Sequence, residues 1–278
     1  MADTEQRTGT VKSGDVNLFY RAFGTAGATP IMILHGANYF DSVDWIEVAG
    51  TLADGREVVT FDRRGFGDSD WSPSKDYSAD ALMEDMRAVA AHLGWTKFIP
   101  MGHSMAGGPA ICFTANFPEI AEKLIIVDSN MSGEGGGGGP SIGNPPTMFD
   151  SIDAAMARFA KLGNPPRFAK DRARAEAGLK KVEGGYRLKR DPDFRNGVPQ
   201  GDGIRKPVLQ DQTRDEQLNR IAQPILLVRG SKSDRYPPEE VERVTAAYPR
   251  IQWAVVESEH DVAYQDPEGL IAAVRAFI

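Results

Sequence analysis

A short segment near the middle of the chain combines a serine with the small neighbours that a sharp turn requires. The segment Gly102–Gly107 (GHSMAG) follows an apolar run and precedes an apolar helical pattern. A direct turn from strand to helix forces the serine into strained dihedral angles, so the flanking side chains must be small. Gly102 and Ala106 meet this need, with alanine a mild departure from a second glycine. Such a turn exposes the Ser104 hydroxyl at a sheet edge and points the following N–H groups toward an incoming oxygen.

Short apolar runs recur along the chain and supply the elements that must hold this turn. Runs of this length, bounded by glycine and polar residues, are typical of strands buried on both faces of a parallel sheet. They predict strands at 15–23, 30–34, 57–61, 98–101, 124–127, 225–228 and 253–256. Helical spacing predicts helices at 79–93, 238–247 and 267–278. The alternation predicts an α/β fold with a parallel sheet.

Residues 131–220 interrupt this alternation. They begin with a flexible Gly- and Pro-rich segment, GEGGGGGPSIGNPP, and contain no strand-like run of comparable strength. Helical patterns follow at 151–162 and 167–182. We therefore predict a helical cap (lid) at 131–220, inserted between the core segments 1–130 and 221–278, with a disordered linker as the alternative.

Composition and charge exclude several classes of protein. The 278 residues are 41% apolar and carry a formal net charge of −7, so we expect binding neither to nucleic acid nor to an anionic membrane surface. No apolar run reaches the ~18 residues of a membrane span, and the N-terminus lacks a secretory signal. The single cysteine, Cys112, fits a reducing compartment, and four histidines leave little for a metal cage. We expect a cytoplasmic monomer or homodimer without metal or cofactor.

Five motifs together resemble the α/β-hydrolase superfamily. They are LHG at 34–36, DRRGFGDSD at 62–70, GHSMAG at 102–107, VRG at 228–230 and His260 before DVAYQDPEG. The resemblance covers almost the whole chain. It implies an α/β-hydrolase fold, with a mostly parallel central sheet flanked by helices and a cap insertion. The motifs are specific for the fold and only weakly specific for the substrate.

The resemblance also implies roles for individual residues. Ser104 is expected to be the nucleophile, and His260, in a loop after the last strand, the base that takes its proton. The backbone N–H groups of Ala37 and Met105 are expected to form the oxyanion hole. The implied reaction is hydrolysis of a small carboxylic ester, or a related acyl bond, through an acyl-enzyme. A serine at this turn argues against dehalogenase and epoxide-hydrolase chemistry, which in related enzymes uses a carboxylate nucleophile.

Two aspartates fit the chain order Ser…Asp…His, and the sequence leaves both open. Most superfamily members place the acid three residues beyond a strand-ending glycine, which here is the position of Ser233, with Asp234 one residue further. Asp128 stands at the end of the strand predicted at 124–127, as in a minority of the superfamily. We favour Asp128 as the residue that orients the histidine and keep Asp234 as the alternative.

Other activities remain compatible with these residues. Hydrolases of C–C bonds, amide-cleaving relatives and perhydrolases share the same triad, and a non-catalytic ligand receptor can be built on the same fold. Dinucleotide binding is not expected, because Asp70 replaces the third glycine of a G-x-G-x-x-G pattern that would begin at Gly65.

Residues that follow these motifs are candidate contacts for a small-molecule substrate in an apolar pocket, with core packing as the alternative for each. The candidates are Tyr39, Phe40, Trp45, Tyr236, Tyr264 and, beside the serine, His103. The predicted cap carries 16 Lys and Arg residues against 12 Asp and Glu. Much of this charge is expected on a solvated face. The sharper hypothesis is that one or two cap arginines bind a carboxylate of the substrate.

Overall fold

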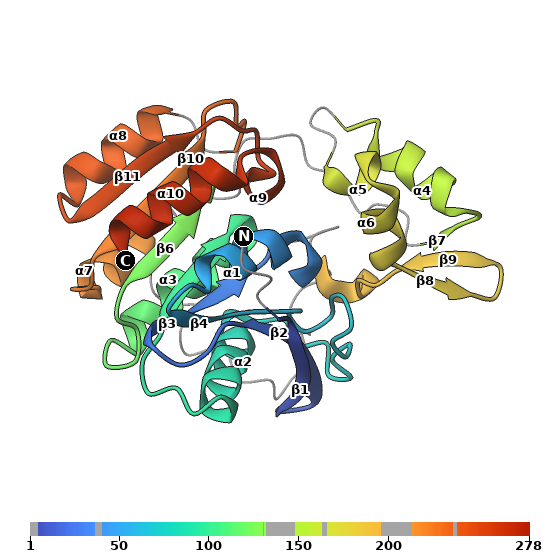
Figure 1. Ribbon diagram of the computed structural model, residues 1–278, viewed down its shortest axis with the longest axis horizontal. Helices are drawn as coiled ribbons and strands as arrows, with labels where there is room; N and C mark the ends of the chain where they lie inside the picture. The colour runs from blue at the N-terminus through green and yellow to red at the C-terminus, as the bar shows by residue number, and fades with distance from the viewer. Residues whose placement is uncertain are drawn as a thin grey trace.

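The computed structural model describes residues 5–36, 41–129, 131, 148–162, 166–195, 213–235 and 238–278. An eight-stranded sheet with the strand order β1-β2-β4-β3-β5-β6-β10-β11 forms its centre (Figure 1). The strands are β1 (Arg7–Ser13), β2 (Val16–Phe23), β3 (Ala28–Leu34), β4 (Arg56–Phe61), β5 (Ile99–His103), β6 (Leu124–Val127), β10 (Ile225–Gly230) and β11 (Ile251–Val256). β1 and β2 are antiparallel to their neighbours, and the strands from β4 to β11 run parallel. The predicted α/β-hydrolase arrangement, a mostly parallel sheet, is confirmed.

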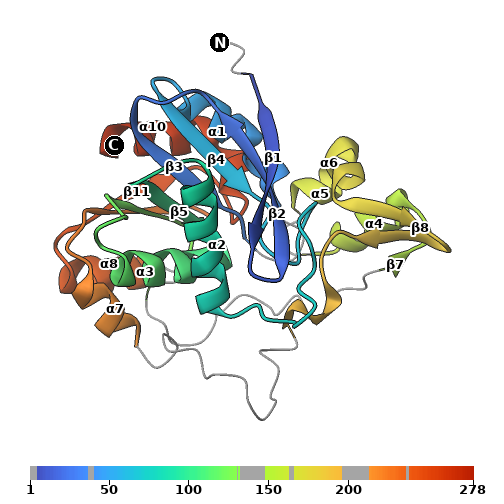
Figure 2. The same cartoon turned by 90° about the horizontal axis from the view of Figure 1, so that it is seen from below.

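Helices cover both faces of this sheet, as Figure 2 shows. They are α1 (Ile46–Leu52), α2 (Ala79–His92), α3 (Gly107–Asn116), α7 (Arg214–Arg220), α8 (Pro238–Ala247), α9 (Val262–Gln265) and α10 (Pro267–Phe277). Successive side chains of a strand point to opposite faces. In β3, Ile31 and Ile33 therefore pack beneath α1 and α10, whereas Met32 and Leu34 pack beneath α2 and α3. The continuous apolar runs in the sequence follow from this burial on both sides.

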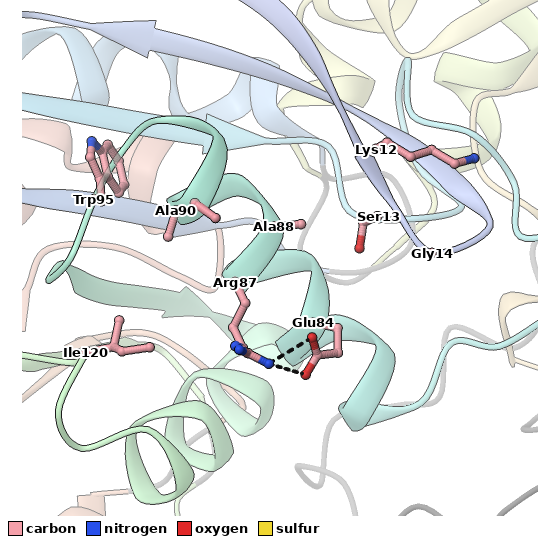
Figure 3. Close-up of a pocket in the computed structure, with 10 residues that line it drawn as sticks. Lys12, Ser13, Gly14, Glu84, Arg87, Ala88, Ala90, Trp95 and Ile120 are labelled. Carbon is pink, nitrogen blue, oxygen red and sulfur yellow. Dashed lines mark hydrogen bonds and ion pairs between the residues drawn. The ribbon is translucent and has the colours of Figure 1, made fainter.

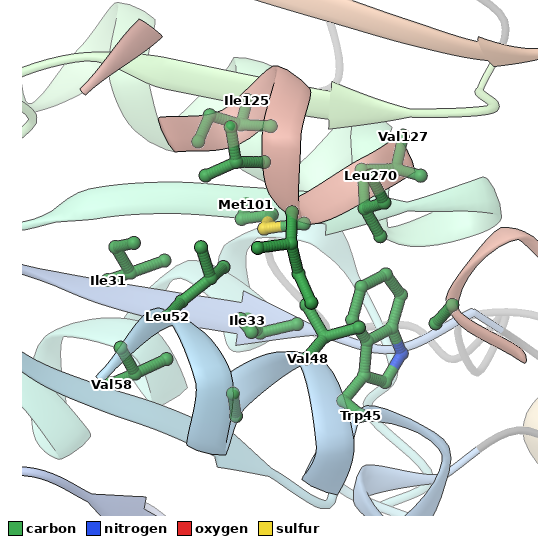
Figure 4. Close-up of a cluster of buried hydrophobic side chains, with 14 of the residues drawn as sticks. Ile31, Ile33, Trp45, Val48, Leu52, Val58, Met101, Ile125, Val127 and Leu270 are labelled. Carbon is green, nitrogen blue, oxygen red and sulfur yellow. The ribbon is translucent and has the colours of Figure 1, made fainter. Parts of the chain in front are cut away.

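The cluster beneath α1 and α10 also supports the end of β5, where the serine turn begins. Trp45, Val48 and Leu270 lie over Met101 and Ile33 in this cluster (Figure 4). Trp45 is only 1% exposed and closes the short 3-10 helix η1 (Ser42–Trp45). A close-packed interior tolerates little displacement. The sheet edge that carries the candidate site is therefore held by well-packed side chains.

A smaller unit lies beside one end of the sheet (Figure 1). It consists of β7 (Met148–Phe149), α4 (Ile152–Phe159), α5 (Arg167–Lys170), α6 (Arg172–Ala177), β8 (Leu179–Val182), β9 (Gly185–Leu188) and the 3-10 helix η3 (Pro192–Arg195). Phe149, Phe159, Phe168 and Leu188 form its own apolar cluster. We call this unit the cap.

The described part of the cap differs from the purely helical insertion that the sequence predicts. The helix expected over 167–182 breaks at Asp171, whose side chain accepts the N–H of Arg174 and so begins α6. After α6, the chain forms the β8–β9 hairpin, in which Gly184 adopts a positive φ that glycine allows. With β7, the hairpin makes a three-stranded antiparallel sheet.

Helix α7 lies with the core, although the predicted boundary at 221 would assign it to the cap. Its Leu218 is buried in one cluster with Ile111 of α3 and with Ile225 and Leu227 of β10. We therefore place the end of the cap before α7.

The surface carries a shallow groove, and the described helices fall short of the combined length and hydropathy of a membrane span. A shallow groove lies between the β1–β2 turn and α2 (Figure 3), and its lining includes Lys12, Glu84, Arg87 and Trp95. The charges of Glu84 and Arg87 pair with each other at 3.0 Å. Among the described helices, none is both long and apolar enough to cross a membrane.

Candidate active site

The serine turn joins β5 to α3 in the way that the small residues predict. Ser104 has a φ of +53°, in the left-handed region that is unfavourable for residues other than glycine. A Cβ atom at Gly102 would lie 2.5 Å from the main-chain oxygen of Ala106, so no larger residue fits there. A Cβ atom at Gly107 would collide with the side chain of Ser129. Ala106 itself is fully buried, which shows that the turn accommodates one methyl group at this position.

A hydrogen-bond chain connects three side chains from distant parts of the sequence. The Oγ atom of Ser104 lies 2.9 Å from Nε2 of His260, and Nδ1 of His260 lies 2.7 Å from Oδ2 of Asp128. Asp128 follows β6 and His260 follows β11. The carboxyl ends of these parallel strands and of β5 meet at one edge of the sheet, so the topology brings the three groups together. With Nδ1–H donating to the carboxylate, Nε2 is left to accept the serine proton.

Of the two aspartates that the sequence leaves open, Asp128 contacts the histidine. It is fully buried and accepts two further hydrogen bonds, from the N–H of Gly230 at 3.1 Å and from the hydroxyl of Ser233 at 2.5 Å. Its φ of +45° is one that aspartate tolerates better than most residues. The side chain of Asp234 is 40% exposed and pairs with its neighbour Arg235 at 3.1 Å. Ser233, at the position where most of the superfamily carries the acid, thus supports the carboxylate instead.

Of the two expected oxyanion donors, Met105 lies within the described residues and Ala37 does not. Met105 is the second residue of the 3-10 helix η2 (Ser104–Ala106), so its N–H has no acceptor within that helix. This N–H is available beside the serine hydroxyl, while the Met105 side chain is 49% exposed. Ala37, and the expected substrate contacts Tyr39, Phe40 and Tyr236, lie outside the described residues.

His103 does not occupy the position of a substrate contact. Its ring is 1% exposed, and Nε2 lies 2.9 Å from the main-chain oxygen of His260. The ring also packs against the rings of His260 and Trp45, with centroids 4.9 Å and 5.5 Å away. Burial and the nearby His260 lower the pKa of His103 to about 3, so the ring is neutral and donates Nε2–H to that oxygen. We therefore assign His103 to holding the loop of His260, and Trp45 to the core.

Three carboxylates and one arginine form a buried ionic cluster between cap and core, which we call the cap anchor. Arg174 of α6 binds Asp44 through Nε at 2.6 Å and Asp41 through Nη2 at 3.1 Å. All three residues are at most 5% exposed. Asp261, the residue after His260, accepts the main-chain N–H of Arg167 at 2.9 Å. Burial raises the pKa of Asp41 to about 7 and that of Asp261 to about 6.

The sequence gives no signal for the cap anchor, because Arg174 and Asp44 are 130 residues apart. The anchor also bears on the expectation that cap arginines bind a substrate carboxylate. Arg174 is committed to Asp41 and Asp44, and Arg167 pairs with Asp171 at 3.0 Å while lying over the ring of Tyr264. These two cap arginines are therefore occupied by contacts within the protein.

Metal ligands are not gathered in the described part of the chain. Within it, no group of three or more His, Cys, Asp or Glu side chains is arranged to hold a metal ion. The chemistry that the site offers through its described residues is thus that of the serine, the imidazole, the carboxylate and main-chain N–H donors.

A family model described as "alpha/beta hydrolase fold" matches residues 29–267. The chain belongs to this family. The match includes the serine turn, Asp128 and His260, so the candidate triad lies within the matched residues.

Relatives of this alpha/beta hydrolase are similar at modest identity. The sn-1-specific diacylglycerol lipase ABHD11 of Mus musculus is 26% identical over 277 residues, covering 92% of this chain and 82% of the lipase. The same-named lipase of Danio rerio is 31% identical over 170 residues, which are 60% of this chain and 50% of the lipase. An uncharacterized protein of Mycobacterium tuberculosis is 35% identical over 121 residues, 43% of this chain. The chain spans about a third, 35%, of the length of that mycobacterial relative.

Solved structures reproduce the fold over nearly the full length. The thioesterase domain from the curacin biosynthetic pathway has a TM-score of 0.77 at 19% identity, with 98% of this chain and 99% of that chain covered. E-2-(acetamidomethylene)succinate hydrolase has a TM-score of 0.77 at 20% identity, with the same coverage of 98% and 99%. At these identities, the likeness shows the alpha/beta hydrolase fold alone.

Proposed function

We propose that this enzyme is a serine hydrolase that cleaves a small carboxylic ester through an acyl-enzyme. Ser104 acts as the nucleophile, His260 as the general base and then the general acid, and Asp128 as the residue that orients the imidazole. The observation that carries the proposal is the hydrogen-bond chain from Asp128 through His260 to Ser104, at 2.7 Å and 2.9 Å. The name of the diacylglycerol lipase relatives supports an ester as the bond that is cleaved.

The reaction divides into two steps that use the same groups. In the first, Oγ of Ser104 attacks the ester carbonyl, its proton passes to Nε2 of His260, and the carbon–oxygen bond to the alcohol breaks as His260 returns that proton to the leaving oxygen. In the second, water attacks the acyl-enzyme, its proton passes through His260 to Oγ, and the carboxylic acid leaves. The N–H of Met105, with that of Ala37 as its partner, stabilises the negative oxygen in both steps.

Asp128 contributes by fixing the imidazole rather than by taking a proton. Its carboxylate keeps the proton on Nδ1 and stabilises the imidazolium that forms when Ser104 is deprotonated. The hydrogen bonds from Gly230 and Ser233 hold the carboxylate in this orientation. The neutral His103 donates a hydrogen bond to the main-chain oxygen of His260 and so holds its loop.

Labelling and turnover test the nucleophile together. We expect the enzyme to release 4-nitrophenol from short-chain 4-nitrophenyl esters and to react covalently with a serine-directed phosphonate. Ser104→Ala removes the nucleophilic oxygen and abolishes both signals. Persistent labelling of Ser104→Ala at the wild-type rate would show that another residue is the nucleophile. A β-diketone and an anilide tested beside the esters separate ester hydrolysis from C–C and amide cleavage.

A further inference from the structure

One buried arginine beside the candidate site forms no ion pair with any carboxylate in the described part of the chain. Arg63 follows β4 and is 1% exposed. Among the described residues, it takes part in no ion pair; its Nη1 donates to the main-chain oxygen of His35 at 3.1 Å, and its Nε has no hydrogen-bond partner. A buried charge without a partner is costly, so proteins rarely retain one.

Two other buried arginines, Arg64 and Arg174, do bind carboxylates. Arg64, the next residue, binds Asp85 through Nε and Nη2, both at 2.7 Å. Arg174 binds Asp41 and Asp44 in the cap anchor. Burial raises the cost of the Arg63 charge and lowers the pKa of this arginine to about 10, which still leaves it protonated at neutral pH. Arg63 is therefore a buried cation to which none of the described carboxylates is paired.

The position of Arg63 relates it to the reacting atoms. Leu34 of β3 pairs with Phe61 of β4 on one side and with Gly102 of β5 on the other. Two residues beyond these positions come Arg63 and Ser104, separated by one strand. Since parallel neighbours are ~4.8 Å apart, the two backbones are about 10 Å apart at this edge. The bond to His35 turns the guanidinium toward β3, hence toward Ser104.

Aromatic rings from core and cap enclose the guanidinium. Its central carbon lies 5.2 Å from the ring centre of Phe66, in the loop after β4, and 5.6 Å from that of Phe194, in η3 of the cap. The two rings meet edge to face at 4.7 Å. The cation thus lies where the cap closes over the core. Burial is the main cause that lowers the pKa of His35, and the positive charge of Arg63 lowers this pKa further. His35 lies next to the expected oxyanion loop.

From this arrangement we propose that Arg63 binds a carboxylate of the substrate, so that the enzyme selects esters carrying a second, negatively charged carboxyl group. The inference rests on the proposed ester hydrolysis and names its substrate class. A carboxylate that reaches the guanidinium beside the Phe66–Phe194 pair would supply the missing counter-charge and accept the unused Nε–H. The planar guanidinium suits such a two-point contact.

Matched substrates measure this preference directly. The probes are the 4-nitrophenyl half esters of succinic, glutaric and adipic acid, each compared with the neutral analogue in which the free carboxyl is a carboxamide. We expect wild-type kcat/KM to favour the carboxylate in at least one pair, and Arg63→Met to lower that carboxylate-to-carboxamide ratio by roughly 10- to 100-fold. Arg172→Met, which removes an exposed cap arginine, leaves the ratio unchanged. A wild-type ratio near one for all three pairs, or an unchanged ratio in Arg63→Met, would overturn the proposal.

Thermal unfolding supplies a readout that does not depend on turnover. Because Arg63 forms no ion pair with the described residues, Arg63→Met is expected to melt no lower than the wild type, whereas replacement of an arginine with a structural role would lower stability. Added adipate raises the melting temperature of the wild type and not that of Arg63→Met. If the wild type hydrolyses neither ester of a pair, the proposed ester hydrolysis fails, and the adipate shift alone then decides whether Arg63 binds a carboxylate. A lowered melting temperature of Arg63→Met, or no adipate shift, contradicts the inference.

Discussion

Removal of the Arg174 guanidinium tests how strongly the cap is attached to the core. Arg174→Met keeps much of the apolar length of the side chain and deletes the cation between Asp41 and Asp44. Both carboxylates are buried, at 5% and 4% exposure, and would then share no positive partner in the cap anchor. The variant should therefore lose stability through uncompensated buried charge rather than through a cavity.

The size of the loss follows from the burial of these groups. Deleting one partner of a buried ion pair typically costs about 3–5 kcal/mol. For a protein of this size, each kcal/mol corresponds to about 2–4 °C in the melting temperature, which predicts a fall of about 6–20 °C at pH 8. Burial already disfavours the ionised form of Asp41 in the wild type, since it raises the pKa of this carboxyl to about 7 even with Arg174 in place.

The loss should depend on pH in a defined direction. A carboxyl group whose folded-state pKa is raised contributes stability that is fully present below its unfolded pKa, near 3.8 for Asp41, and is lost as the pH rises through the folded value. Without Arg174, the folded-state pKa of Asp41 rises further. The gap in melting temperature between wild type and Arg174→Met should therefore be smaller at pH 5.5 than above pH 8.

Two further variants make the test specific. Arg172→Met, on the same helix, removes an exposed arginine that pairs with Asp153 and Glu176, and should change the melting temperature little at any pH. Adding Asp41→Asn to Arg174→Met removes a titrating carboxyl and should narrow the gap at pH 8. A loss in Arg174→Met no larger than that in Arg172→Met, or one that does not grow with pH, would refute the reasoning.

Three further predictions address the candidate triad and the serine turn. Asp128→Asn should lower kcat by about 10³- to 10⁴-fold because a carboxamide no longer fixes the imidazole tautomer that carries its proton on Nδ1, whereas Asp234→Asn should stay near the wild type; equal losses in an ester assay would contradict this assignment. Gly102→Ala should destabilise the protein by about 1–3 kcal/mol in urea unfolding, because its Cβ meets a main-chain oxygen at 2.5 Å, and Gly108→Ala, which meets only a flexible side chain, serves as the control. His103 has a pKa lowered to about 3, so its contribution to stability is present above pH 6.5 and lost as the pH falls toward 3; His103→Gln should flatten this acid limb, and an unchanged limb would count against a buried neutral ring.

The parts of the fold that the sequence predicted well are those that burial alone determines. Leu124–Val127 is apolar at every position because β6 is covered on both faces, and its predicted bounds are those of the strand. The hairpin β8–β9 was missed because Lys180 and Lys181 are exposed and, of its residues, only Leu179 and Leu188 are fully buried, so its pattern is too weak to distinguish from a helix. Strand β1 was not predicted for the same reason, because most of its residues are exposed.

Some residues of the candidate site could likewise be predicted from the sequence, and others could not. The turn at Ser104 was visible because sterics restrict its neighbours to small residues. The sequence signal for Asp128 was subtler: Ser233 occupies the usual position of the acid, and this hydroxyl proves to donate to Asp128. The role of His103 and the contacts of Arg174 depend on residues more than a hundred positions away, so spacing along the chain could not indicate them.

The bond between Asp261 and the main-chain N–H of Arg167 limits how the enzyme can be rebuilt. Asp261 is adjacent to His260, so the loop that carries the base also carries a docking point for the first residue of α5. A cap taken from another hydrolase to change specificity would leave Asp41, Asp44 and Asp261 facing a surface not shaped for them. Cap exchange in this protein therefore has to transfer the acceptors on the core together with the insertion, and recombination points drawn only at the ends of the insertion should yield unstable chimeras.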